Sequence, residues 1–136
     1  MTEHKLSFKV LGEPVPTPRP RNPPLAMMIK SKKVWMYSGN KDSKKWAKDI
    51  QAECPGMHHY DEAQVRIYFM TNKKIDGDNC EKGVLDALTG ILWDNDKKVW
   101  DCHWTRLEPK DEPFTLIEVI GNEPEHVQAR LLSEVV

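Results

Sequence analysis

The sequence has few cysteines, no long hydrophobic run and almost no net charge, and each of the first two absences excludes a class of protein. The three cysteines, Cys54, Cys80 and Cys102, have no short regular spacing. We therefore expect no disulfide framework and a reducing compartment. Every apolar run is far shorter than the roughly 20 residues of a membrane-spanning helix. The polar residues 1–9 do not have the pattern of a signal peptide. The sequence thus predicts a soluble, intracellular domain.

Familiar catalytic and metal-binding motifs are also missing. The chain contains no Walker loop, no Rossmann glycine pattern and no G-x-S-x-G elbow. The acidic loop that starts at Asp94 does not fit an EF-hand, because its positions six and twelve are Val99 and Thr105 rather than glycine and glutamate. The cysteines and histidines also lack the paired spacing of a zinc site.

The net charge of −1 conceals a basic half and an acidic half. Residues 1–50 carry 11 Lys/Arg against 4 Asp/Glu, a charge of +7, and residues 51–136 carry 9 against 17, a charge of −8. Such asymmetry between two halves of a chain is typical of proteins that bind polyanions through one of them. The total charge therefore does not argue against a nucleic-acid partner.

The pattern of apolar residues predicts one compact α+β domain, residues 1–136, because the chain is long enough for one core and too short for two. We expect a mixed sheet of about four strands with two main helices. Alternation and β-branched runs predict strands at 6–10, 64–70, 99–107 and 114–120, with a short strand near 34–36. Helical spacing predicts helices at 43–52 and 78–91. Residues 122–136 form a tail or a further helix.

Residues 12–24 form a proline- and arginine-rich arm. Its prolines fix φ and lack an N–H group, which excludes a helix interior or a central strand, so we expect an extended, semi-rigid segment. Its two arginines are two residues apart and therefore share a side. The helix at 43–52 is rich in lysine. These basic side chains are either solvated or in contact with phosphates: Arg19, Arg21, Lys44, Lys45 and Lys48.

Carboxylates are most concentrated between residues 75 and 101. Asp76 and Asp78 flank Gly77 where a helix is expected to begin, and side chains two apart in an extended segment point the same way. Two converging carboxylates repel each other unless a cation neutralises them, and a hard divalent cation such as Mg²⁺ prefers oxygen ligands. The expected helix brings further polar residues to the side opposite its apolar face: Asn79, Lys82 and Asp86.

Structural roles account for the same acids. Asp78 with Glu81 three residues later matches a capping box, so Asp78 is either an N-cap or a metal ligand. Asp94 and Asp96 belong to a polar loop that is either solvated or the source of a third ligand. These alternatives remain open on residue pattern alone.

Three segments resemble one protein family. Asp76-Gly77-Asp78-Asn79-Cys80-Glu81-Lys82, the run 86–90 (Asp-Ala-Leu-Thr-Gly) and the run 93–99 (Trp-Asp-Asn-Asp-Lys-Lys-Val) are similar to the RusA family of Holliday junction resolvases. The run 14–21 (Pro-Val-Pro-Thr-Pro-Arg-Pro-Arg) resembles the opening element of that family. The resemblance covers about residues 6–120.

The resemblance implies a RusA-like fold and a Mg²⁺-dependent endodeoxyribonuclease, with Mn²⁺ as a substitute cation. It further implies a homodimer that nicks four-way DNA junctions in recombination and repair, in the cytoplasm of a bacterial or phage-infected cell. Asp76 and Asp78 match the paired metal-binding aspartates, Lys82 matches the family's helix lysine, and Asp96 matches the third catalytic acid. Asp94 is the alternative third ligand, because the family often has adjacent acids where Asn95 precedes Asp96 here.

The chemical requirements of phosphodiester hydrolysis agree with this implication. Phosphodiester hydrolysis needs an activated water, charge relief on the phosphate and a stabilised leaving oxygen, all of which carboxylate-bound divalent cations supply. A catalytically silent or broader branched-DNA binding protein on the same fold is the alternative, although all the motif acids and Lys82 are present.

Overall fold

The structure is a computed structural model, which describes residues 2–17, 41–110 and 112–124. The strand expected near 34–36, both arm arginines and the C-terminal segment beyond residue 124 lie outside the described residues.

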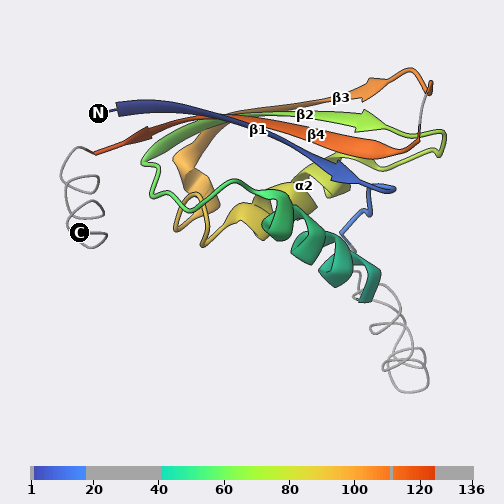
Figure 1. Cartoon of the computed structure of the whole chain (residues 1–136), viewed down its shortest axis with the longest axis horizontal. Helices are drawn as coiled ribbons and strands as arrows, with labels where there is room; N and C mark the ends of the chain where they lie inside the picture. The colour runs from blue at the N-terminus through green and yellow to red at the C-terminus, as the bar shows by residue number, and fades with distance from the viewer. Residues whose placement is uncertain (1, 18–40, 111, 125–136) are drawn as a thin grey trace, which may run out of the picture.

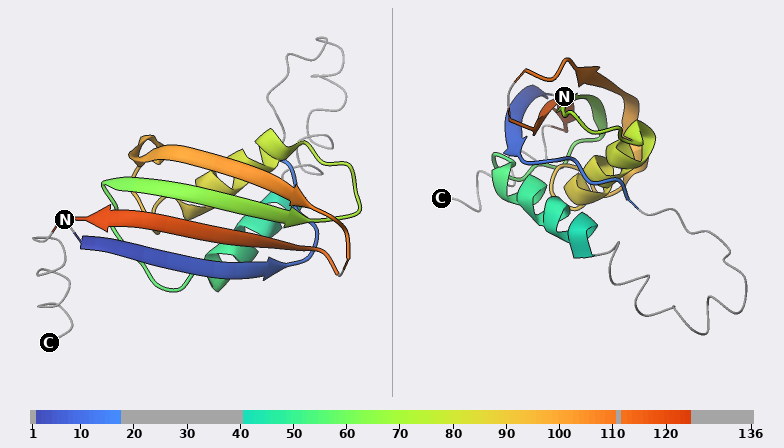
Figure 2. Two further views of the ribbon diagram at one scale, coloured as in Figure 1. Left: turned by 90° about the horizontal axis from the view of Figure 1, so that it is seen from above. Right: turned by 90° about the vertical axis from the view of Figure 1, so that its right-hand side faces the viewer.

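Four strands form one mixed sheet: β1 (Thr2–Leu11), β2 (Glu62–Met70), β3 (Val99–Leu107) and β4 (Phe114–Glu123). Their order across the sheet is β1-β4-β2-β3 (Figures 1 and 2). β4 pairs antiparallel with both β1 and β2, while β2 and β3 are parallel. The strands are those that alternation and β-branched composition predict, and the α+β class is confirmed.

Two helices cover one face of this sheet (Figures 1 and 2). Residues 41–53 are helical, and α2 (Gly77–Leu88) connects the parallel strands β2 and β3. A crossover of this kind is required because parallel strands cannot be joined by a tight hairpin. A single 3₁₀ turn, η1 (Asp96–Lys98), precedes β3. Within the described ranges, no helix is long and apolar enough to cross a membrane.

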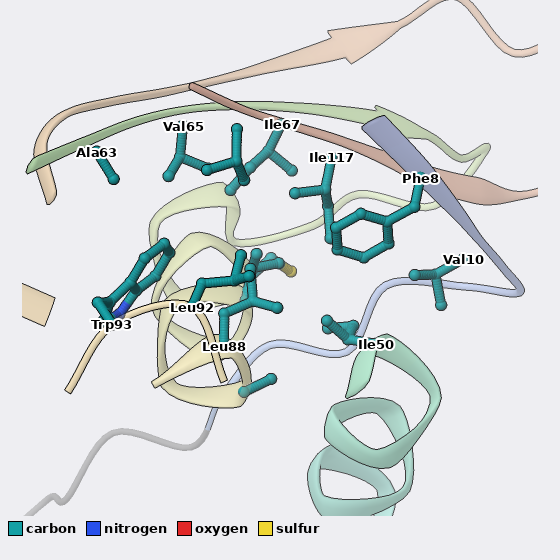
Figure 3. Packing of buried hydrophobic residues seen from close by; sticks show 14 of the residues in the cluster. Phe8, Val10, Ile50, Ala63, Val65, Ile67, Leu88, Leu92, Trp93 and Ile117 are labelled. Carbon is teal, nitrogen blue, oxygen red and sulfur yellow. The ribbon is translucent and has the colours of Figure 1, made fainter. Parts of the chain in front are cut away.

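The hydrophobic core lies between the sheet and the helices (Figure 3). Alternate residues of β2 and β4 point toward the helices, as period-two patterning requires. Ile50, Ile67, Leu88 and Ile117 have at most 1% of their surface exposed. Burial of this apolar layer holds α2 against the sheet and thereby fixes the position of its first turn.

Three element boundaries differ from expectation by three residues or more. α2 ends at Leu88 rather than at residue 91, because the chain turns at Gly90, which has φ of +92°. β4 continues to Glu123 and β1 begins at Thr2, since these strands pair along their whole length from Thr2↔Glu123 to Leu11↔Phe114. Backbone pairing extends both strands through polar residues, so hydropathy alone underestimates their length.

Candidate metal and phosphate site

Asp76 and Asp78 lie at the beginning of α2, at the end of the sheet where β2 finishes (Figure 1). Both side chains are exposed. Asp76 Oδ1 accepts a hydrogen bond from the Asn79 backbone N–H at 3.2 Å, and Oδ2 accepts from Asn79 Nδ2 at 2.9 Å. Two carboxylates thus occupy one solvent-accessible corner of the fold.

The N-cap of α2 is Asp76, not Asp78. The capping box that the sequence predicts for Asp78 and Glu81 is therefore wrong, because Asp78 already lies within the first helical turn. Asp76 satisfies one of the unpaired N–H groups at the helix start. Asp78 does not cap the helix, and its negative charge lies at the positive end of the helix dipole.

Asp78 is held by a residue of β3. The Trp104 indole Nε1–H donates a hydrogen bond to Asp78 Oδ1 at 3.1 Å. The indole also covers Gly77 so closely that a Cβ atom built there would lie 2.1 Å from Trp104 Cζ2. Gly77 is helical and has no positive φ. The glycine between the two aspartates is therefore required by the close approach of the indole, not by an unusual backbone conformation.

Lys82 and Asp86 follow Asp78 at intervals of four residues along α2, and both are exposed. This spacing leaves them on the same side of the helix as Asp78. Asn79 is half-buried because it binds the Asp76 cap. The helix therefore presents one cationic and several anionic groups along its solvent side, as its sequence predicts.

Asp96 and Asp94 lie beyond the opposite end of α2, in the loop before β3. Twelve helical residues rise about 18 Å, and this length separates the two acidic regions. β3 gives a similar separation. Trp104, which contacts Asp78, lies five residues after Val99, and five residues span about 17 Å along a strand. Asp76 and Asp78 thus both lie at the start of α2, whereas Asp94 and Asp96 lie beyond its end.

The proline arm leads to the first turn of α2. Thr17 N–H donates to the Asn79 carbonyl at 3.2 Å. At Gly83, one turn further along the helix, an added Cβ would lie 2.8 Å from Thr17 Oγ1 and 3.2 Å from the Trp46 ring. The arm and the helix at 41–53 therefore meet on α2, next to the acid pair. The lysines expected to contact phosphate are exposed on that helix: Lys44, Lys45 and Lys48.

The ligands at this corner suit a hard divalent cation. Asp76 and Asp78 supply carboxylate oxygens, which retain lone pairs beside the hydrogen bonds they accept. The sulfur of Cys80, a residue of the same helix, does not compete. Burial, followed by the charge of Asp76, raises the pKa of Cys80 to about 12, so its thiol stays protonated near neutral pH. The donor set at this corner therefore fits Mg²⁺ or Mn²⁺ better than zinc.

Two contacts at this corner are not predicted by the sequence pattern. Trp104 is 26 residues from Asp78, and no periodicity links them; the only available signal is Gly77, whose missing side chain leaves room for a neighbour. Thr17 against Asn79 has no sequence signal, because a backbone hydrogen bond does not depend on side-chain type.

The chain was also compared with known proteins. A family model described as Endodeoxyribonuclease RusA matches residues 12–120. No curated protein matches the chain.

Proposed function

The chain belongs to the RusA family of endodeoxyribonucleases, and we propose that it is a divalent-metal-dependent homodimer that cleaves four-way DNA junctions during recombination and repair. The observation that carries this proposal is the exposed pair Asp76 and Asp78, which lies at the point where the basic arm meets α2. The proposed cellular setting is the cytoplasm.

Asp76 and Asp78 are the residues that would hold Mg²⁺. When bound there, the cation would supply an activated water and would relieve negative charge on the scissile phosphate. Asp76 is fixed by its cap contacts to Asn79, and Asp78 is oriented by the Trp104 N–H, so neither carboxylate has to be reorganised on binding. Lys82, one turn further along the helix, neutralises a non-bridging phosphate oxygen.

In this proposal a third ligand, Asp96, comes from a second copy of the chain. The length of α2, which separates Asp78 from Asp96 along one chain, supports this assignment. A two-fold related copy in antiparallel orientation would bring the start of its β3 toward the start of the first copy's α2, and the homodimer would then complete the site. It also gives two sites related by symmetry, which matches the near two-fold symmetry of a four-way junction.

Contacts with DNA backbone come from the basic half. Residues 18–40 contain five cationic side chains and no carboxylate: Arg19, Arg21, Lys30, Lys32 and Lys33. Thr17, immediately before this segment, is fixed on α2 beside the acid pair. Lys44, Lys45 and Lys48 add exposed charge on the following helix. Such cations bind phosphates without reading sequence, as recognition of branched shape requires.

A cleavage assay tests the proposed activity. An immobile four-way junction and a linear duplex of the same sequence are incubated with the protein and Mg²⁺. We expect paired nicks in the junction and little cutting of the duplex. Asp78→Asn should abolish cleavage while junction binding is kept or tightened, since a negative charge near phosphate is removed. The exposed residue Glu53 provides a matched control, Glu53→Gln, which should cleave normally.

Other outcomes of this assay discriminate among functions. Equal cleavage of junction and duplex would contradict selectivity for junctions. Binding of junctions without cleavage in Mg²⁺ or Mn²⁺ would support a DNA-binding role instead. Loss of binding by Asp78→Asn in metal-free buffer would show that Asp78 is needed for folding rather than for catalysis.

Mixing two inactive variants tests the composite site. If each site takes Asp78 from one copy and Asp96 from the other, a heterodimer of Asp78→Asn and Asp96→Asn has one intact site. The mixture, unfolded and refolded together, should regain single-strand nicking that neither variant has alone. No regained nicking, with mixed dimers verified by mass spectrometry, would refute the contribution of Asp96 from a second copy.

A further inference from the structure

A second group of metal-ligating side chains lies at the other end of the sheet. His4 is near the start of β1, Glu123 is the last residue of β4, and His58 lies in the segment before β2. One ligand atom from each of these residues falls within 4.8 Å of the others. The strand register explains the meeting: His4 pairs with Gly121, so its side chain is on the same face as Glu123, two residues further along β4.

The group is buried and ordered by contacts rather than gathered on the surface. Glu123 is only 1% exposed, and the two histidines are half-buried. Glu123 Oε1 accepts from His58 Nδ1 at 2.8 Å and from the His59 backbone N–H at 3.0 Å. A carboxylate has about four acceptor positions, so these two bonds leave capacity for a cation.

The ring of Tyr60 packs against both histidines of this group. Its ring stacks on His58, with the centroids 5.0 Å apart, and meets His4 edge-on at 5.9 Å. The Tyr60 hydroxyl is buried and has no hydrogen-bond partner among the residues that the structure describes. A water molecule on a bound cation would give a buried polar atom of this kind a partner.

We propose that His4, His58 and Glu123 form a second metal site, which takes a late first-row divalent cation such as Zn²⁺. Two imidazole nitrogens and one carboxylate oxygen are ligands that zinc accepts and that Mg²⁺ does not favour. Zinc ligands at about 2.0–2.1 Å lie roughly 3.3 Å from one another in tetrahedral geometry. The side chains therefore need to move by only on the order of 1 Å from their present positions.

The cation would join three segments at one end of the fold. β1 begins at this end, β4 ends there, and His58 lies in the segment between the helix at 41–53 and β2. One ion would therefore link the start of β1, the end of β4 and that segment. This end is opposite to the one where β2 finishes and α2 begins (Figure 1). The proposed site is therefore separate from the Asp76 and Asp78 pair and does not depend on nuclease activity.

Zinc titration of the untagged, EDTA-treated protein tests the proposal, with millimolar Mg²⁺ present to occupy the oxygen-ligand corner. Calorimetry should show one Zn²⁺ bound per chain, and thermal unfolding should show a higher midpoint with zinc. Co²⁺ should give the visible absorption of a nitrogen- and oxygen-bound ion. His4→Asn and His58→Asn should each weaken zinc binding by roughly 100-fold or more, since each removes one of three ligands.

A control variant separates this site from another histidine–carboxylate pair. The exposed His103 Nε2 lies 2.8 Å from Asp101 Oδ1, and the described residues add no third ligand to this pair, so His103→Asn should bind zinc normally. The proposal is overturned if the protein binds no zinc, if His4→Asn and His58→Asn bind it as the original chain does, or if His103→Asn abolishes binding.

Discussion

Replacing Gly77 with alanine places a methyl group where the Trp104 indole lies. A Cβ atom at Gly77 would meet three atoms of that ring at 2.1, 2.3 and 2.4 Å. Carbon atoms in favourable contact lie about 3.5–4.0 Å apart, so the ring has to move by more than 1 Å. The hydrogen bond of 3.1 Å from Trp104 Nε1 to Asp78 is lost in that movement.

The expected change in the free energy of unfolding is the difference between two opposing contributions. Overpacking of this kind costs about 1–3 kcal/mol. Trp104 is 36% exposed and is able to swing toward solvent, which places the cost in the lower half of that range. Alanine also favours a helix over glycine by up to about 1 kcal/mol. We therefore expect Gly77→Ala to lower the free energy of unfolding by about 1 kcal/mol, roughly a fivefold change in the folding equilibrium.

A double-mutant cycle with Trp104→Ala isolates the clash. Urea unfolding of the four proteins gives the effect of Gly77→Ala with and without the indole. Once the ring is absent, alanine should stabilise the protein by up to about 1 kcal/mol, so the coupling energy is about 2 kcal/mol. Equal effects of Gly77→Ala in both backgrounds would refute the reasoning that the indole explains the glycine.

Other side chains lead to separate expectations. Leu88 has no exposed surface, so Leu88→Ala should lower the free energy of unfolding in urea by about 2–5 kcal/mol, and a loss below 1 kcal/mol would contradict its place in the core. The hydrogen bond from Arg66 holds the pKa of Asp101 below its ordinary value of 3.8. A carboxyl group whose pKa is lower in the folded state stabilises the fold above its unfolded pKa, and this stabilisation disappears as the pH falls through the folded pKa. Asp101→Asn should therefore destabilise the protein at pH 7, and it should do so progressively less as the pH drops below 3.8. Cys80, whose pKa is raised to about 12, should resist alkylation near pH 8 in the native protein and react after unfolding, as peptide mass spectrometry would show. Arg19→Ala should reduce the slope of log binding constant against log salt by about one, and an unchanged slope would remove that arginine from the DNA interface.

The sheet could be predicted from sequence because each strand carries its own pattern. β3 was expected at residues 99–107 and lies there, and the two helices follow from apolar residues at helical spacing. The helix start could not be fixed in this way. Asp76 and Asp78 each have a polar residue three positions later, so both match an N-cap, and only the observed hydrogen bond identifies Asp76.

The candidate site could be predicted only in part. Asp76 and Asp78 are separated by one residue in the chain, so both necessarily lie at the start of the same helix. The position of Asp96 depends on the direction of α2 relative to the parallel strands. The spacing of acidic residues along the sequence does not determine that direction. The approach of Trp104 to Asp78 depends on how β3 pairs with β2, and the meeting of His4 with Glu123 depends on the register of β1 and β4; no local spacing encodes either.

The β2–α2–β3 crossover has a consequence for folding kinetics. The contact between Trp104 and Asp78 joins residues 26 apart, and it forms only when two parallel strands have paired around an intervening helix. Contacts of such sequence separation require loop closure before they give any stabilisation, and parallel pairing is slow for that reason. A peptide covering residues 71–98 would contain Asp76, Asp78 and Asp96 in order, yet its Asp78 would lack the indole that orients it. The indole can therefore orient Asp78 only after β3 has paired with β2, whereas the cap contacts of Asp76 with Asn79 are local.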